Sequence, residues 1–264
     1  MNYQHICNEV VAIAKDVATF IANEKSNFDP AKIENKAKFD YVTYVDKASE
    51  EKIIAGLEKL IPESGFIAEE GSSTKHGDKY NWIIDPLDGT TNFIHDLPPH
   101  AISIALQEDN EIVIGVVYEI TKNECFYSYK GAPVFLNGKE VHTSQTKKVA
   151  NSLVATGFPP ANFSMIDNHM EAMRYFMYNT HGIRRIGSAA SNLAYLAAGR
   201  FDAFFEHGVK AWDIAAGAFL VRQAGGKTIG INGDEDFLFK EQIVASNSVV
   251  FNEFYELVSK FFKQ

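Results

Sequence analysis

The chain has 264 residues, of which 46% are hydrophobic and 22% charged, and its formal net charge is −9. This length allows one large domain or two closely packed halves, and the composition is that of a globular protein, neither disordered nor fibrous. The negative charge argues against non-specific or direct nucleic-acid binding, which needs a basic surface to displace counterions from the phosphates. An acidic protein with an anionic substrate needs a local positive charge, and a bound metal can supply it.

The cysteines and the N-terminal segment indicate the cellular context. Cys7 and Cys125 lie far apart and form no CxxC pair, so we expect buried reduced thiols, no zinc site and no disulfide framework. The first residues lack the basic segment and apolar core of a signal peptide, and no stretch has the ~20 apolar residues of a membrane span. These features predict a cytoplasmic protein without a membrane partner.

The first part of the chain predicts helices followed by strands. Apolar residues at helical spacing indicate a helix over residues 2–25 and a second helix, with Asp46 as its N-cap, that stops at Pro62. Apolar runs predict strands over 65–68 and 82–84, each followed by acidic residues. An antiparallel meander is expected over 101–107, 112–118 and 125–129, and Asn137-Gly138 indicates a later hairpin.

The polar segment 144–148 is the best candidate for a junction, because strands and helices alternate after it. The pattern predicts strands over 153–156, 183–186 and 201–205, helices over 167–178, 189–198 and 212–224, then a strand and a terminal helix. We therefore expect an α/β protein of two packed halves. Residues 1–147 would form an N-terminal α+β half, and residues 148–264 a C-terminal α/β half.

The most informative segment, residues 82–92, reads WIIDPLDGTTN and carries two acids three residues apart, Asp85 and Asp88. Pro86 fixes φ and stiffens a turn that presents both acids on one side. Residues 89–91 are typical of a helix start, whose free N–H groups favour an anion such as phosphate. Two close carboxylates repel unless cations neutralise them, and hard oxygen ligands select Mg²⁺, Ca²⁺ or Mn²⁺ over zinc.

Two further acidic motifs follow the same pattern. AEEG at residues 68–71 places Glu69 after a strand, and AWDIAAG at residues 211–217 places Asp213 at the opening of a small, apolar helix. Taken alone, Glu69 is typical of a solvated turn and Asp213 of a helix N-cap. The order of strand, acid, proline, acid, glycine and threonine in the first motif is hard to explain as a turn only, and we interpret it as a site for metal and phosphate.

WIIDPLDGTTN and AWDIAAG resemble the two signatures of the inositol monophosphatase family, within the wider group of lithium-sensitive, magnesium-dependent phosphatases. AEEG, DYVTYVD at residues 40–46 and GSAASN at residues 187–192 fall where the family has its other elements, so the resemblance covers nearly the whole chain in order. It implies a layered αβαβα sandwich, a homodimer, phosphomonoesterase activity and inhibition by millimolar lithium.

The resemblance also implies a set of metal ligands. Glu69, Asp85 and the backbone carbonyl of Leu87 would bind one Mg²⁺ ion. Asp85, Asp88 and Asp213 would bind a second, and a weaker third ion would use Glu69 and water. Mn²⁺ is a possible substitute.

The catalytic roles are likewise implied by the family. The attacking water would lie near Thr90, with Asp46 and Glu69 orienting or deprotonating it, and Gly89 and Thr90 would donate N–H groups to the phosphate. The reaction is direct in-line hydrolysis with no phosphoenzyme, which is consistent with paired cations that activate water and neutralise charge at both ends of the displacement.

The resemblance implies less about substrate binding than about the metal ligands. Glu206 aligns with the family's hydroxyl-binding glutamate and Ala189 with a backbone contact to inositol, and Asp88 and Asp213 would also touch substrate hydroxyls. These matches favour inositol 1-phosphate or a related small phosphorylated polyol, sugar or nucleotide. The bulky Phe39 departs from the family in a loop that overhangs the site in relatives, so NADP(H) 2′-phosphate and fructose 1,6-bisphosphate stay open as substrates.

Two other classes of protein compete with this interpretation. The aspartyl-phosphate hydrolases carry DxDGT after an apolar strand, with the first aspartate as nucleophile, whereas this chain has DxxDGT, one residue longer. A regulatory binding protein could keep the phosphatase fold, but degenerate relatives usually lose ligands. Here the expected metal ligands, Asp46 and Thr90 are all present, which favours activity.

Overall fold

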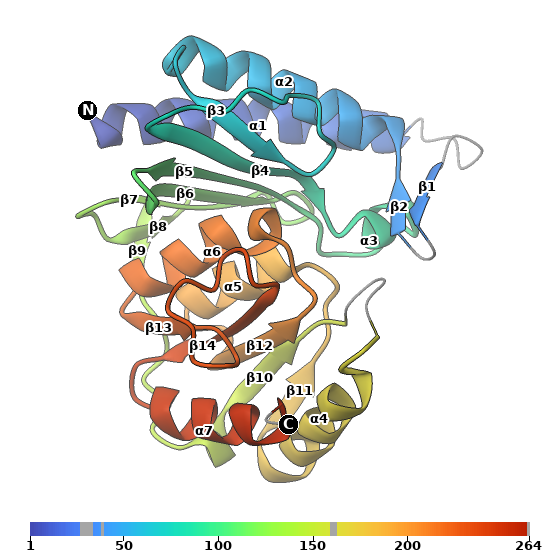
Figure 1. Ribbon diagram of the computed structural model, residues 1–264, viewed down its shortest axis with the longest axis vertical. Helices are drawn as coiled ribbons and strands as arrows, with labels where there is room; N and C mark the ends of the chain where they lie inside the picture. The colour runs from blue at the N-terminus through green and yellow to red at the C-terminus, as the bar shows by residue number, and fades with distance from the viewer. Residues whose placement is uncertain (27–33, 38–39, 159–162, 263–264) are drawn as a thin grey trace.

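The computed structural model describes residues 1–26, 34–37, 40–158 and 163–262, and its elements stack in five layers (Figure 1). A pair of helices covers a seven-stranded sheet, a second pair lies between that sheet and a five-stranded sheet, and a third pair covers the far face. The layered αβαβα sandwich predicted from the sequence is therefore confirmed. Phe39 lies outside the described residues.

The first sheet has the strand order β3-β4-β5-β6-β7-β8-β9, and α1 (Tyr3–Ser26) and α2 (Tyr44–Leu60) pack on its outer face. Its strands are β3 (Gly65–Ala68), β4 (Tyr80–Asp88), β5 (Ala101–Glu108), β6 (Glu111–Glu119), β7 (Glu124–Tyr129), β8 (Val134–Leu136) and β9 (Lys139–Val141). β3 runs parallel to β4, and the other neighbours are antiparallel. The expected meander is confirmed, as is the hairpin at Asn137-Gly138, where both residues have positive φ.

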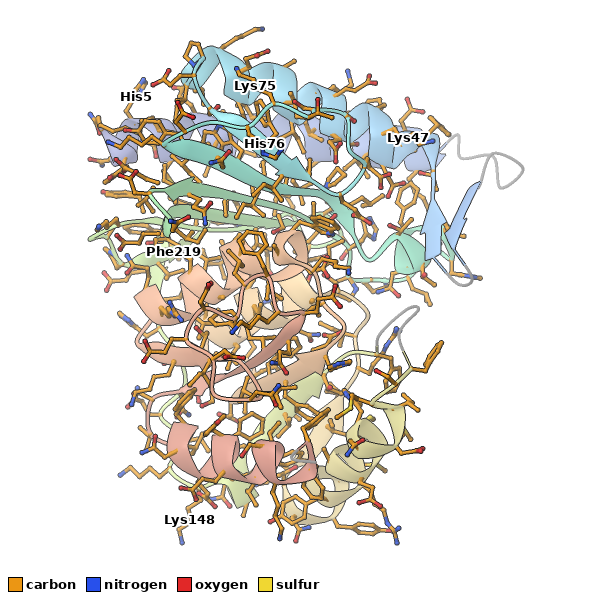
Figure 2. The ribbon with its side chains drawn as sticks, viewed as in Figure 1. His5, Lys47, Lys75, His76, Lys148 and Phe219 are labelled. Carbon is orange, nitrogen blue, oxygen red and sulfur yellow. The ribbon has the colours of Figure 1, made fainter. Side chains whose placement is uncertain are left out.

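The central layer consists of α5 (Ala189–Ala197) and α6 (Ala211–Gln223), which are buried because both sheets cover them. Small residues let these helices approach their neighbours closely. A Cβ on Gly217 of α6 would lie 2.5 Å from the Cβ of Leu193 in α5, and a Cβ on Gly115 of β6 would lie 2.9 Å from the Phe219 ring. Figure 2 shows Phe219 at the boundary between α6 and the first sheet. This close packing fixes the position of α6 against β4, β5 and β6.

The second sheet has the order β11-β10-β12-β14-β13 and carries α4 (Ile166–Asn179) and α7 (Phe251–Phe262) on its outer face. Its strands are β10 (Leu153–Thr156), β11 (Gly182–Arg184), β12 (Ala203–His207), β13 (Gly226–Ile229) and β14 (Gln242–Asn247). β10 is parallel to β11 and β12, and β14 is antiparallel to β12 and β13. The strand predicted over 201–205 begins at Ala203 and ends at His207, and directly before it the Asp202 carboxylate accepts the Leu153 N–H at 2.6 Å.

Pro86 does not turn the chain as expected, because β4 continues through it to Asp88. Asp85 pairs with Ser103 and Asp88 with Ala101, so β4 has one more residue than β5 between these pairs. Such a bulge accommodates a proline, which has no N–H for the ladder, and re-aims the side chains beside it. The bulge therefore replaces the expected turn.

Smaller features complete the fold. The hairpin of β1 (Glu34–Ala37) and β2 (Asp40–Val42) lies beside α3 (Thr90–Ile94) at one side of the molecule (Figure 1). Cys7 and Cys125 are buried free thiols, as expected. In the described part of the chain, every helix is too short or too polar to span a bilayer.

Candidate active site

An open pocket of about 180 Å³ gathers most of the residues singled out by the sequence. It lies where the ends of β3, β4 and β12 meet the starts of α3, α5 and α6. The predicted residues that line it are Glu69, Asp85, Leu87, Asp88, Gly89, Thr90, Ala189, Glu206 and Asp213. Asp46 lies behind this lining and reaches the pocket through Thr90.

The bulge in β4 orients Asp85 and the Leu87 backbone. The Leu87 N–H donates to Asp85 Oδ1 at 2.9 Å, and the Leu87 carbonyl oxygen lies 3.1 Å from Thr90 Oγ1. Both Asp85 and the Leu87 side chain are buried. The local chain thus holds a carboxylate and a backbone carbonyl at the same edge of the pocket, and both are oxygen ligands that suit a hard cation.

Asp88 is held by the N-terminus of α5. Its Oδ2 accepts hydrogen bonds from the Ser188 hydroxyl at 2.6 Å and the Ala190 N–H at 2.7 Å, and the Ala189 backbone also contributes. Ser188 is the N-cap of α5 and accepts the Ser191 N–H. Burial raises the pKa of Asp88 to about 6, although these hydrogen bonds and the helix end favour the carboxylate.

Asp213 is the third residue of α6 instead of its opening residue, because the helix begins at Ala211 with Lys210 as its cap. Its Oδ2 accepts the Lys210 N–H at 2.6 Å. This is the capping-box hydrogen bond in which the side chain of the third helical residue reaches back to the backbone of the N-cap. The Ser103 hydroxyl of β5 donates to the Trp212 carbonyl at 2.9 Å and ties this helix start to the first sheet. Asp213 is therefore fixed relative to the acids of β4.

The acids of the pocket strongly repel one another. Burial raises the pKa of Asp85 well above its ordinary value, and Glu69, Asp88 and Asp213 raise it further. Burial followed by repulsion from Asp88 and Glu69 has the same effect on the pKa of Asp213. A cation bound among these acids would stabilise their ionised carboxylates, because a nearby positive charge offsets the cost of burying negative charge.

The donor set fits a hard divalent cation, since every candidate ligand is a carboxylate or carbonyl oxygen. Within the described part of the chain, no group of three or more histidine, cysteine, aspartate or glutamate side chains is placed so that it could hold a metal ion. The fit consequently rests on the shared pocket and on the repulsion among its acids.

Asp46 and Thr90 form a hydrogen-bonded pair. The N-cap of α2 is Thr43 instead of Asp46, and Asp46 is the third residue of the helix, where its Oδ2 accepts the Thr43 N–H at 2.8 Å and the Thr43 hydroxyl at 2.5 Å. Its Oδ1 lies 3.0 Å from Thr90 Oγ1. Burial raises the pKa of Asp46, while these hydrogen bonds lower it. The sequence indicated the correct helix but assigned its cap to the wrong residue.

Gly89 is the N-cap of α3 and has φ of +92°. A Cβ here would lie 3.1 Å from both the Gly187 and Pro99 carbonyl oxygens. Asn92 cross-links the same region by donating from Nδ2 to the carbonyls of Pro99 and Ile186, each at 2.8 Å. Glycine therefore lets the chain turn tightly into α3, whose first N–H groups have no partner within the helix.

Glu206 forms a second wall of the pocket with Gly157, Phe158 and Arg185. A Cβ on Gly157 would lie 2.0 Å from Glu206 Oε1, so only glycine leaves room for this carboxylate. Burial and repulsion from Asp88 raise the pKa of Glu206 to about 8, and the Arg185 charge lowers it. The Arg185 guanidinium lies 5.3 Å from the centre of the Phe158 ring.

Several lining residues were missed by the sequence reasoning. Arg185 and Gly157 lie outside every motif that the sequence analysis used, and Ser188 lies in the GSAASN element but was given no role. Asn192 also lines the pocket, and both polar atoms of its buried side chain lack a hydrogen-bond partner among the described residues. Its sequence signal was its place at the end of the GSAASN element, which the resemblance marked without giving Asn192 a role.

Comparisons with known proteins agree with this fold and motif set. A profile of the inositol monophosphatase family matches residues 2–261. Nus factor SuhB of Pseudomonas aeruginosa is 39% identical over 253 residues, covering 94% of this chain and 93% of that protein. Inositol-1-monophosphatase of Mesorhizobium japonicum is 36% identical over 256 residues, covering 97% and 96%.

A crystal structure of the extragenic suppressor protein SuhB from Bartonella henselae superposes with a TM-score of 0.91 at 33% identity, covering 97% of this chain and 99% of that one. The chain belongs to the inositol monophosphatase family, as its motifs predicted. As a member of this metal-dependent family it is a phosphoric monoester hydrolase, and its substrate is a small phosphorylated molecule.

Proposed function

We propose that this enzyme is a Mg²⁺-dependent phosphomonoesterase that hydrolyses inositol 1-phosphate, or a related small phosphate ester, by direct attack of water. The observation that carries the proposal is the convergence of Glu69, Asp85, Asp88 and Asp213 in one pocket beside Thr90. Buried acids that repel one another are stabilised by a cation, and an all-oxygen donor set suits Mg²⁺, Ca²⁺ or Mn²⁺, of which we propose Mg²⁺.

The metal ligands in this proposal are those expected from the resemblance. Glu69, Asp85 and the Leu87 carbonyl hold one ion, and Asp85, Asp88 and Asp213 hold a second. A weaker third ion uses Glu69, and Mn²⁺ is a substitute. Paired divalent ions supply an activated water and neutralise charge on the phosphoryl group and the leaving oxygen.

Asp46, Thr90 and Glu69 act on the attacking water. The Thr90 hydroxyl donates a hydrogen bond to Asp46 Oδ1. The lone pairs of Thr90 Oγ1 are then free to accept a hydrogen bond from the attacking water. The proton can then pass from water to Thr90 as the Thr90 proton moves to Asp46. Burial raises the Asp46 pKa towards the range in which a carboxylate works as a general base.

The remaining contacts position the substrate. Gly89 and Thr90 donate backbone N–H groups to the phosphate, and Asp88 and Asp213 contact substrate hydroxyls. Glu206 accepts a hydrogen bond from a hydroxyl of the leaving group, and the Ala189 backbone contacts the same group. Fructose 1,6-bisphosphate and the 2′-phosphate of NADP(H) remain the alternative substrates.

The test is phosphate release in Mg²⁺ from inositol 1-phosphate, fructose 1,6-bisphosphate, NADP and 3′-phosphoadenosine 5′-phosphate, with EDTA as the control. We expect Mg²⁺-dependent turnover with the highest kcat/KM for inositol 1-phosphate. A higher kcat/KM for NADP or fructose 1,6-bisphosphate would reassign the substrate. A lithium titration at limiting Mg²⁺ tests the expected inhibition, which unchanged activity would contradict.

A regulatory role is a second candidate function, because one relative with 39% identity carries the name Nus factor. The Asp88→Asn variant separates the two functions, since a binding role that uses another surface would survive the loss of turnover. The homodimer expected from the resemblance and the cytoplasmic location also remain predictions. Light scattering of the purified protein tests the first of these.

A further inference from the structure

Glu50 is a buried acid that lies outside the pocket lining and has no role in the mechanism above. It lies on α2 four residues after Asp46, and both side chains are buried, at 0% and 1% exposed. Residues four apart project from the same face of a helix. Glutamate is rarely buried completely without a partner, so its contacts indicate why it is there.

The Glu50 carboxylate binds the turn that immediately follows Glu69. Oε2 accepts the Glu70 N–H and Oε1 accepts the Ser72 N–H, each at 2.7 Å. Between these donors, Gly71 has φ of +70°, and its N–H donates to the Ala68 carbonyl at 3.3 Å. One carboxylate therefore fixes both ends of a tight turn through charge-assisted hydrogen bonds.

Glu69 is also fixed from its other side. Its N–H donates to the Ile84 carbonyl of β4 at 3.2 Å, directly before Asp85. The Glu69 backbone is thus held between β4 and Glu50 of α2. The direction of its side chain into the pocket depends on both attachments.

The same face of α2 holds the water-activating pair. Asp46 contacts the Thr90 hydroxyl from one turn of the helix, and Glu50 contacts the Glu69 turn from the next. α2 packs on the sheet through Val45, Ile53 and Leu57, which are fully buried. A rigid helix consequently sets the separation between Thr90 and the backbone that carries Glu69.

We propose that Glu50 is a positioning residue that acts through Glu69 and fixes its carboxylate for metal binding. This inference rests on the proposed function, in which Glu69 is a metal ligand. Residues that orient a ligand typically change metal affinity or activity by 10–100-fold when they are replaced. Glu50→Gln should therefore raise the Mg²⁺ concentration for half-maximal activity by about 10-fold or more.

Two variants separate positioning from charge. Glu50→Gln keeps the shape, but its NH₂ group faces one of the two N–H donors and cannot accept from it. Glu50→Asp keeps the charge but is one methylene too short to hold both donors. We expect both variants to bind Mg²⁺ more weakly by titration calorimetry, while KM at saturating Mg²⁺ stays within about twofold. Wild-type affinity in Glu50→Asp would mean that charge alone matters and would overturn the proposal.

Glu51→Gln is the matched control, because this neighbour on α2 is exposed. We expect it to match the wild type in Mg²⁺ binding and turnover. Thermal unfolding of every variant reports the fold. A Glu50→Gln protein that melts earlier but keeps the wild-type Mg²⁺ midpoint would make Glu50 a purely structural residue and would overturn the proposal.

A double-mutant cycle tests the route through Glu69. If Glu50 acts by orienting Glu69, adding Glu50→Gln to Glu69→Gln should not change the residual Mg²⁺ affinity further. Additive losses would place the effect elsewhere and contradict the inference. If the wild type itself neither binds Mg²⁺ nor releases phosphate, the proposed function fails, and that result is distinct from a wild-type-like Glu50→Gln.

Discussion

The two walls of the pocket are held in different ways. On the first, Asp85, Asp88 and Asp213 each accept at least one backbone N–H, and these donors lie in the bulge of β4 or at helix starts. On the second, Glu206 packs against Gly157, and its buried Oε2 has no hydrogen-bond partner among the described residues. Backbone donors orient the acids, whereas Glu206 packs against Gly157 and lies near the Arg185 charge.

We infer that the two walls have different roles in the proposed reaction, with the chemistry on the first and substrate selectivity on the second. Backbone N–H groups do not change when side chains are substituted, so the acid wall tolerates sequence change around it while its geometry persists. The Glu206 wall depends on the size of residue 157 and on the Arg185 charge. We therefore expect variants of the acid wall to change turnover and variants of the second wall to change substrate preference.

The largest expected effect comes from the acid wall. Asp88→Asn removes a carboxylate that we propose binds metal, but the asparagine can still accept the Ser188 and Ala190 hydrogen bonds through its carbonyl oxygen. Turnover should fall roughly 100-fold or more, because metal stabilisation of the transition state is worth several kcal/mol. Steady-state kinetics measures the loss, and an unchanged circular dichroism spectrum shows that the fold is intact. Near-native turnover would remove Asp88 from the metal site.

Metal should stabilise the protein most at high pH. The pKa of Asp88 is raised to about 6 and that of Glu206 to about 8, above the unfolded values of about 4. In EDTA, both groups are protonated below pH 4 and contribute fully to the stability of the folded protein. The contribution of Asp88 is lost as the pH rises through about 6, and that of Glu206 as it rises through about 8. Saturating Mg²⁺ should raise Tm by about 5 °C at pH 8 and by less at pH 5. Calorimetry that finds equal shifts would argue against cation neutralisation of this pocket.

Adding a single methyl group at residue 157 tests whether the second wall determines substrate preference. Gly157→Ala would place a Cβ 2.0 Å from Glu206 Oε1, so Glu206 must move. We expect kcat/KM for inositol 1-phosphate to fall about tenfold, since an ordered hydrogen bond to a substrate hydroxyl is lost. The Mg²⁺ midpoint should stay unchanged, and a shifted midpoint would show that the two walls are not independent. Glu206→Gln provides the comparison for loss of the carboxylate itself.

Arg185 is expected to give the smallest effect, because it is exposed and contacts water as well as the Phe158 ring. It supplies the only lysine or arginine charge among the lining residues that the structure describes. Arg185→Gln should lower kcat/KM about threefold for fructose 1,6-bisphosphate and less for inositol 1-phosphate, with the difference fading at high salt. The adjacent Arg184→Gln, which lies outside the lining, is the control, and equal losses for both substrates would exclude a role in selectivity.

The short-range signals in the sequence predicted much of the fold. The helical spacing of apolar residues located α1, and the alternating runs located β5, β6 and β7 to within one or two residues. Local patterns succeed there because each element buries one stripe or face. They failed at Pro86, where a bulge lets the strand continue, and at Asp46, where Thr43 captures the cap position instead.

The sequence by itself also predicted which acids would meet in one pocket, because the three motifs that carry them resemble those of one family. Only the tertiary structure decided what holds them. Ser188 reaches Asp88 across 100 residues and Glu50 reaches the Glu69 turn across about 20. Such partners carry no local signature, since a buried carboxylate needs a donor at a point in space and any segment that arrives there can supply it.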